Sequence, residues 1–187
     1  MNVYDFDGTI YGGDSTLDFY RFSFARKPAL AGMLPFQAAV MAAYTLRRLS
    51  KEAMKAAFFR FLHEIPAADW VPAFWERHEY KLRRWYLQQK QFDDVIISAS
   101  PEFLLTPLVC GVLGVQLIAS RVDIHTGSFT GKNCHGAEKL RRFREAYGDD
   151  AVIDTFYSDS RCDAPIANIA KKAFLVKNNH IVEWGAK

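Results

Sequence analysis

The stretch Met1-Asn2-Val3-Tyr4-Asp5-Phe6-Asp7-Gly8-Thr9 decides the fold, because it places two carboxylates directly after a short apolar segment. Apolar residues that run into a Gly-Thr pair predict a short strand followed by a turn. If the chain stays extended, Asp5 and Asp7 point to the same side, since side chains alternate along a strand. Neighbouring carboxylates repel each other unless a cation or a proton offsets their charge. The stretch therefore predicts a charged site at the end of the first strand.

Further strands and helices are expected to alternate along the rest of the chain. We predict strands at 94–98, 116–120, 151–157, 173–176 and 180–183, with the last two joined across Asn178-Asn179. Helices are expected at 101–113, 136–147 and 164–171, and a β-hairpin at 121–130. This alternation predicts an α/β fold with a parallel sheet and right-handed crossovers.

Small or acidic polar residues follow several of these strands. Ser98 ends the second predicted strand, and Asp159 follows a later one. Ligands of open α/β sheets bind outside the carboxyl ends of the strands, so we expect Asp5, Asp7, Ser98 and Asp159 to share one site. Oxygen ligation by a few carboxylates and water molecules suits Mg²⁺ better than zinc.

Residues 15–92 differ in composition from the rest of the chain. Apolar residues such as Leu17, Tyr20 and Phe24 recur at helical spacing, and Ser50 is a candidate helix N-cap. The segment holds 16 of the 27 aromatic residues and 13 Lys or Arg against 6 Asp or Glu, whereas the remainder holds 11 against 15. We therefore predict a helical cap domain at 15–92 and a catalytic core formed by 1–14 and 93–187.

The segment 28–46 carries no charged residue. Its length is close to the roughly 20 residues that span a bilayer, but two prolines, a glycine and a glutamine interrupt it. A buried helical hairpin is the favoured interpretation, and an interfacial segment or a membrane span is the alternative. We expect no stable membrane span.

Cysteine usage and the N-terminal residues indicate a cytoplasmic protein. Cys110, Cys134 and Cys162 are odd in number and lack CxxC spacing, which argues against a disulfide framework or a zinc knuckle. The N-terminal residues lack the basic and apolar regions of a signal peptide. We expect no nucleic-acid partner, because no nucleic-acid-binding motif is present. The sequence does not indicate the oligomeric state.

The order of the polar motifs resembles that of the haloacid dehalogenase superfamily. Asp5-Phe6-Asp7-Gly8-Thr9 resembles its first motif, Ser98 its second, Lys139 its third, and Asp159-Ser160-Arg161-Cys162-Asp163 its fourth. The stretches at 97–101 and 130–136 are similar to the phosphoserine-phosphatase-like subfamily IB. The resemblance covers essentially the whole chain. It implies a Rossmann-like three-layer α/β/α core with a parallel sheet, plus a helical C1-type cap inserted after the first strand.

The resemblance also implies a reaction, namely Mg²⁺-dependent hydrolysis of a small phosphorylated metabolite through an aspartyl phosphate. Asp5 would be the nucleophile, Asp7 the general acid and base, and Lys139 would offset the negative charge around them. The implied phosphate-binding residues are Gly8, Thr9, Ser98, Ala99 and Lys139. The implied Mg²⁺ ligands are Asp5, Asp7, Asp159 and Asp163.

Several points stay open at this stage. The same residues serve a phosphotransferase or a mutase, and a non-catalytic phospholigand-binding protein is the alternative from another class. Asp14 stands where dedicated phosphoserine phosphatases use a glutamate, and it either contacts the substrate or caps the next helix. Ser158 stands where many relatives have glycine. Ser100 is expected to cap or turn the chain before Pro101 rather than to bind phosphate.

A cationic run at Arg77, Lys81, Arg83 and Arg84 has two interpretations. It is either a solvated helix face or a surface that attracts an anionic substrate toward a lid. The five histidines show no ligand spacing, so we expect them to be structural.

Overall fold

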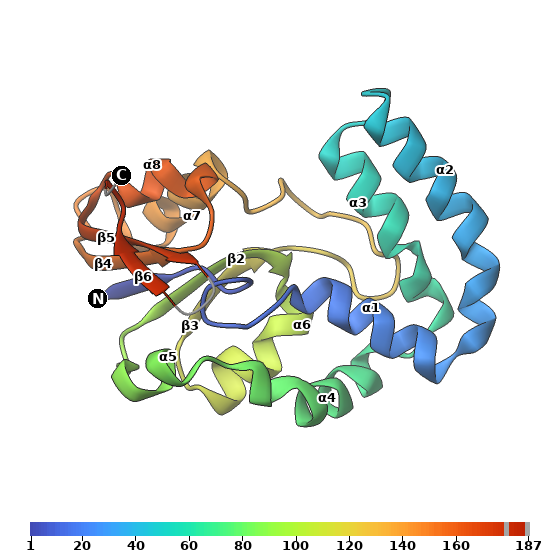
Figure 1. The fold of residues 1–187 in the computed structure, drawn as a ribbon, viewed down its shortest axis with the longest axis horizontal. Coiled ribbons are helices and arrows are strands. Elements are labelled where there is room, and N and C mark those ends of the chain that lie inside the picture. The colour runs from blue at the N-terminus through green and yellow to red at the C-terminus, as the bar shows by residue number, and fades with distance from the viewer. Residues whose placement is uncertain (178–179, 186–187) are drawn as a thin grey trace.

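The core of the molecule is a six-stranded sheet, seen in a computed structural model that describes residues 1–177 and 180–185 (Figure 1). The strand order is β3-β2-β1-β4-β5-β6. The strands are β1 (Asn2–Tyr4), β2 (Val95–Pro101), β3 (Gln116–Ser120), β4 (Ile153–Ser158), β5 (Ala170–Lys177) and β6 (His180–Glu183). The first five are mutually parallel, and β6 pairs antiparallel with β5. The predicted α/β fold with a mainly parallel sheet is confirmed.

Strand β1 lies in the middle of the sheet, between β2 and β4. Val3 and Tyr4 are buried on opposite faces, as expected of a parallel strand covered on both sides. The ladder to β4 continues one residue beyond the strand, because the Asp5 amide donates to the Tyr157 carbonyl at 2.8 Å. Asp5 is therefore held at the carboxyl edge of the sheet.

Helices cover both faces of the sheet and give the predicted three layers. On one face, α7 (Ala137–Tyr147) and α8 (Ala164–Ala167) pack over Val3, Val95 and Phe156. On the other face lie α4 (Ala67–His78), α5 (Arg84–Gln89), α6 (Glu102–Thr106) and the π-helix η4 (Pro107–Val112). The Trp75 indole of α4 donates to the Leu104 carbonyl of α6 at 2.6 Å, which ties these helices together.

The rest of the inserted segment projects from the sheet. It consists of α1 (Ser15–Arg26), the 3-10 helix η1 (Pro28–Met33), α2 (Leu34–Thr45), α3 (Lys51–Phe59) and the 3-10 helix η2 (Arg60–Glu64). The 3-10 helix η3 (Glu79–Lys81) lies instead between α4 and α5, where the Lys81 carbonyl accepts the Gly12 amide at 2.9 Å. Ser50 caps α3 as predicted, since its Oγ accepts the Ala53 amide at 3.1 Å. Figure 1 shows α2 and α3 standing away from the sheet, whereas α4 and α5 lie beneath it.

The segment 28–46 is not the buried hairpin that we predicted. Within α2 only Gln37 and Val40 are buried, while Leu34 and Met41 are 49% and 42% exposed. The physical reason is that the neighbours of α2, which are α3, η1, Tyr20 at Gln37 and Arg60 at Phe36, leave Leu34 and Met41 partly uncovered. Among the described helices, none has the length and apolarity required to cross a bilayer.

One local prediction was also wrong. The helix predicted at 164–171 stops at Ala167, and Ala170–Lys177 forms β5 beside β4. Pairing of this strand overrides the helical preference of its alanines and lysines. The hairpin predicted at 121–130 is present in a short form, since Val122 bridges Phe129 in antiparallel fashion and the Thr130 amide donates to the Arg121 carbonyl at 3.0 Å. The Asp123 carboxylate accepts the His125 and Thr126 amides in its turn. The predicted turn at Asn178-Asn179 lies outside the described residues.

Candidate active site

Asp5 lies at the end of β1 with its carboxylate buried. Its Oδ1 accepts the Phe6 amide and the Lys139 ammonium, each at 2.8 Å, and its Oδ2 accepts Ser158 Oγ at 3.5 Å. Burial raises the pKa of this carboxyl to about 7, although Lys139 opposes the shift. The structure thus fixes one oxygen of Asp5 firmly and leaves the other in weaker contact.

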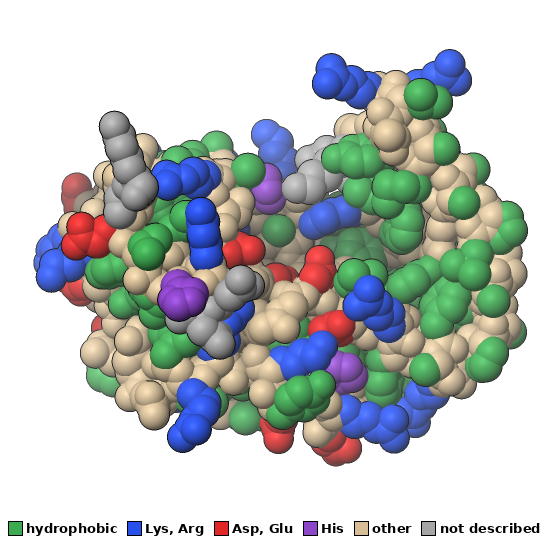
Figure 2. All heavy atoms as spheres, viewed as in Figure 1, with side chains coloured by type: hydrophobic (Ala, Val, Ile, Leu, Met, Phe, Trp, Pro, Cys, Tyr) green, Lys and Arg blue, Asp and Glu red, His purple; other side chains and the backbone are tan. Residues whose placement is uncertain are grey.

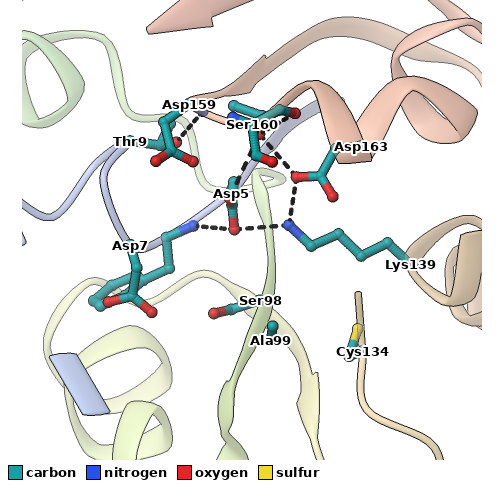
Figure 3. Close-up of polar contacts among 12 residues, drawn as sticks. Asp5, Asp7, Thr9, Ser98, Ala99, Cys134, Lys139, Asp159, Ser160 and Asp163 are labelled. Carbon is teal, nitrogen blue, oxygen red and sulfur yellow. Dashed lines mark hydrogen bonds and ion pairs between the residues drawn. The ribbon is translucent and has the colours of Figure 1, made fainter. Parts of the chain in front are cut away.

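Lys139 reaches Asp5 from the first turns of α7. Its Nζ also donates to Asp163 Oδ2 at 2.7 Å, so one ammonium bridges two buried carboxylates (Figure 3). Asp163 accepts a further bond from Ser158 Oγ at 2.8 Å. Ser158, which replaces the glycine of many relatives, therefore links β4 to this ion-pair network.

Asp7 points toward the start of α1 rather than toward Lys139. Its Oδ1 accepts the Ser15 amide at 2.6 Å, and its Oδ2 accepts the Ser100 hydroxyl. Burial raises the pKa of the Asp7 carboxyl to about 6, and the Asp14 charge acts in the same direction. Ser100 therefore orients Asp7, a contact that the sequence interpretation of Ser100 as a cap or turn residue did not include.

The loop after Asp7 packs tightly against the loop after β4. Gly8 has φ +71°, and a Cβ added there would lie 2.2 Å from Asp159 Oδ2. Thr9 Oγ1 accepts the Asp159 amide at 2.9 Å. The Gly8 and Thr9 amides donate inside their own loop, to Gly13 and Phe6. The predicted contacts of these two residues with phosphate stay predictions.

The second strand contributes Ser98 and Ala99 to the same site. Ser98 is buried, and its Oγ accepts the Ser100 amide at 3.1 Å. The Ala99 carbonyl accepts from Lys55, whose Nζ lies 3.3 Å away and also contacts Asn133 Oδ1. Lys55 reaches the site from α3. Helical periodicity could not single it out among the other cations of the inserted segment.

Asp14 caps a helix, which is one of the two roles that the sequence left open for it. Its carboxylate accepts the Leu17 amide at 2.8 Å and begins α1. It also lies on the wall of the cavity described below. The substrate-contact role stays a prediction.

A cavity of about 1380 Å³ joins these residues to the inserted helices. Figure 2 shows it as a hollow between the sheet and the projecting helices. Its wall on the sheet side is formed by polar site residues, which are Asp5, Asp7, Ser98, Ser100, Lys139, Asp159 and Asp163. Its wall on the helix side comes mainly from α1, α2 and α3, with Arg83 near the sheet. All the predicted site residues except Thr9, which is fully buried, are thus brought together on one cavity.

The four predicted cations do not share one face. Arg83 lines the cavity and donates to the Gly8 carbonyl at 3.3 Å. Lys81 is paired with Asp18 at 2.7 Å, and the Arg77 guanidinium lies over the Phe22 ring. The run is therefore split among three different environments.

The donor set fits a hard divalent cation, although its present side-chain positions do not form a complete shell. In residues 1–177 and 180–185, no three carboxylate, imidazole or thiolate groups are close enough to hold a metal ion. However, Asp5 and Asp163 are bridged by Lys139, and Asp159 lines the same cavity. The missing side chain at Gly8 admits the Asp159 carboxylate to this loop. Oxygen donors with excess negative charge match the preference of Mg²⁺.

Comparison with known proteins gives consistent matches. The family described as haloacid dehalogenase-like hydrolase matches residues 3–168. Protein CicA from Caulobacter vibrioides is 28% identical over 185 residues, which cover 90% of this chain and 82% of CicA.

Two solved structures share the fold. A protein of unknown function from Bordetella pertussis Tohama I has a TM-score of 0.72 at 21% identity, covering 92% of this chain and 87% of that one. A phosphoserine phosphohydrolase-like protein from Francisella tularensis has a TM-score of 0.52 at 19% identity, with 92% and 86% covered. At these identities the likeness concerns the fold.

Proposed function

The chain belongs to the haloacid dehalogenase-like hydrolase family, and from this membership we propose that it is a Mg²⁺-dependent phosphatase acting on a small phosphate monoester. The observation that carries the proposal is the Asp5 carboxylate, held at the end of β1 by Lys139 and the Phe6 amide on the polar wall of a large cavity. The proposal assigns each remaining site residue a role in phosphoryl transfer.

Asp5 is the nucleophile in this proposal. Its carboxylate oxygen attacks phosphorus, the bond to the alcohol oxygen breaks, and an aspartyl phosphate forms. Lys139 lies 2.8 Å from Asp5 and offsets the negative charge that two anions bring together. Ser98, which lies in β2 and lines the cavity, is available to hydrogen-bond a phosphoryl oxygen.

Asp7 moves the protons. In its acid form the carboxyl donates a proton to the departing alcohol oxygen, and the resulting carboxylate then takes a proton from the water that hydrolyses the aspartyl phosphate. The bonds from the Ser15 amide and the Ser100 hydroxyl hold this carboxyl between α1 and β2. The proton donor is therefore fixed before the substrate arrives.

Asp5, Asp159, Asp163 and the Asp7 carbonyl would hold the magnesium ion. The bound cation supplies charge neutralisation between the carboxylates and the phosphate dianion. Without it, the carboxylates that surround Lys139 would repel the substrate. The helices of residues 15–92 form the cap in this proposal and enclose the cavity opposite Asp5.

Phosphate release from p-nitrophenyl phosphate tests the proposal. Purified protein should release phosphate with Mg²⁺ and lose this activity in excess chelator, and restored Mg²⁺ should recover it. Asp5→Asn should remove turnover while circular dichroism and thermal unfolding stay close to wild type, because the amide keeps the shape of the carboxylate. Undiminished turnover in chelator, or turnover by Asp5→Asn, would contradict the proposal.

A further inference from the structure

The two walls of the active-site cavity differ in chemistry. The wall at the strand ends is polar and charged, whereas seven of the nine residues that α1, α2, α3 and η2 contribute among the described side chains are apolar or aromatic. The apolar residues are Leu17, Tyr20, Met41, Met54, Phe58, Phe59 and Phe61. Hydrophobic side chains are visible on the helix side of the hollow in Figure 2.

Part of this apolar wall is left in contact with solvent. Leu17 is 43% exposed and Met41 is 42% exposed, while Tyr20, Met54 and Phe58 are half-buried. Phe61, by contrast, is buried against Tyr20, so it supports the wall from behind. Covering exposed apolar area stabilises a complex by about 25 cal/mol per Å². Binding of a group that covered Leu17 and Met41 would be stabilised by this burial of apolar area.

The size of the cavity exceeds the needs of a short polar ester. Its volume of about 1380 Å³ lies above the range of about 300–1,000 Å³ typical of small-molecule sites. A phosphate at Asp5 fills only the polar end. The remaining volume lies against the apolar wall, where the carboxylate of Asp14 is already used to cap α1.

We infer that the ester has an amphiphilic structure, with its phosphate at Asp5 and an alkyl, prenyl or acyl group along Leu17, Met41, Met54 and Phe58. The inference rests on the proposed phosphatase function and names the substrate class for that same site. Lys55 and Arg83 line the cavity together with these residues and add positive charge for the phosphate end. Helix α2, whose sequence is uncharged, contributes Met41 to this wall.

The preference for an ester with a long apolar group can be measured with n-alkyl phosphates from ethyl to octyl. These esters are used below the concentration at which they form micelles. Each methylene that becomes buried should raise kcat/KM by about three- to fourfold until the wall is covered. Ethyl phosphate serves as the internal reference for the polar end. Hydrolysis of the whole series without any rise in kcat/KM would overturn the inference and leave the phosphatase proposal intact. Hydrolysis of none of the esters would overturn the phosphatase proposal itself.

Matched variants of α2 locate the apolar group. Met41→Gln keeps the length and helix propensity of the side chain and should lower the ratio of kcat/KM for octyl phosphate to kcat/KM for ethyl phosphate. Leu34→Gln is the control, because Leu34 is exposed on α2 but does not line the cavity. An unchanged rise in Met41→Gln would contradict the assigned position.

A second arm of the experiment distinguishes the source of the ester. Dioleoyl phosphatidic acid in phosphatidylcholine vesicles is compared with monomeric octyl phosphate in solution. Hydrolysis in the vesicles supports an ester drawn from a bilayer, and hydrolysis confined to the soluble ester supports one taken from solution. Both outcomes support the amphiphilic class. Failure of both, with ethyl phosphate still hydrolysed, would overturn it.

Discussion

Lys139 is a buried lysine, and its contribution to the stability of the fold depends on the two carboxylates that it bridges. Lys139→Met would leave Asp5 and Asp163 buried without their cation, which typically costs about 3–5 kcal/mol. We expect urea unfolding at neutral pH to show a loss of this size. Lys171→Met is the control, since Lys171 makes a 2.7 Å ion pair with Asp154 on the surface and should lose much less. Equal losses in the two variants would contradict the burial argument.

Ser100 acts on the reaction through Asp7 in our account. Asp7→Asn should lower kcat by about 10²–10⁴-fold, because it removes general acid and base catalysis. Ser100→Ala should lower kcat by a smaller factor and leave KM nearly unchanged, because it loosens the carboxyl without removing it. Ser23→Ala is the matched control, since its buried hydroxyl donates to the Phe19 carbonyl within α1. A change in KM alone would exclude a positioning role for Ser100.

At the scale of single residues, the sequence predicted the site residues whose positions follow from the parallel direction of the strands that carry them. Asp5 and Asp159 follow β1 and β4, and Ser98 lies within β2, so parallel pairing is sufficient to bring them to one edge. Ser100 and Lys55 depend on contacts between distant segments, with Asp7 and with the Ala99 carbonyl. No local pattern encodes such a contact. The sequence therefore indicated the proposed catalytic acids and missed the contacts that Ser100 and Lys55 make beside them.

Helix α7 offers a test of stability against pH. Glu138 in its first turn accepts bonds from Arg141 and Arg142, and the Arg141 bond is the main cause that lowers the pKa of Glu138 to about 2. A carboxyl with a lowered folded-state pKa stabilises the protein fully above its ordinary value. This contribution is lost as the pH falls through the lowered value.

The difference in unfolding free energy between wild type and Glu138→Gln should therefore be largest near neutral pH. It should shrink as the pH falls from about 4.5 toward about 2. Urea unfolding at a series of pH values measures this difference directly. A difference that stayed constant across this range would show that the ion pairs do not stabilise α7.

Elements with a strong local signal were predicted well. Strand β3 has the predicted bounds, and α7 begins one residue later than predicted. Strand β5 was partly mistaken for a helix, because its Ala-Lys-Lys-Ala start favours a helix and only pairing with β4 makes it a strand. Tertiary pairing, rather than propensity, decides such segments.

Two neighbouring arginines, Arg83 and Arg84, differ in their position relative to the cavity and should differ in their effect on substrate binding. Arg83 lines the cavity, whereas Arg84 is exposed on α5 outside it. Arg83→Gln should raise KM for a phosphate ester by about tenfold, the loss expected of one charge-assisted contact, with a smaller effect on kcat. Arg84→Gln should change neither constant. Equal effects of both variants would favour a general influence of surface charge.

The arrangement of the whole molecule was predictable in its layers but not in the exposure of its inserted helices. Motif order indicated the core, and the helical spacing of residues 15–92 indicated the insertion, whose boundaries as a domain stay a prediction. The uncharged segment 28–46 was expected to be buried, because apolar residues usually are. Its exposure depends on which neighbours α2 meets, and these neighbours leave Leu34 and Met41 partly exposed.

The central claim is that Asp5 becomes phosphorylated during turnover. Rapid acid quenching with radiolabelled p-nitrophenyl phosphate, followed by peptide mapping, tests it most directly, and Asp7→Asn is used to slow hydrolysis of the intermediate. We predict a hydroxylamine-sensitive label on the N-terminal peptide at Asp5, and no label in Asp5→Asn. A label on another residue, or turnover by wild type with no labelled intermediate under conditions that trap a known aspartyl phosphate, would contradict the account.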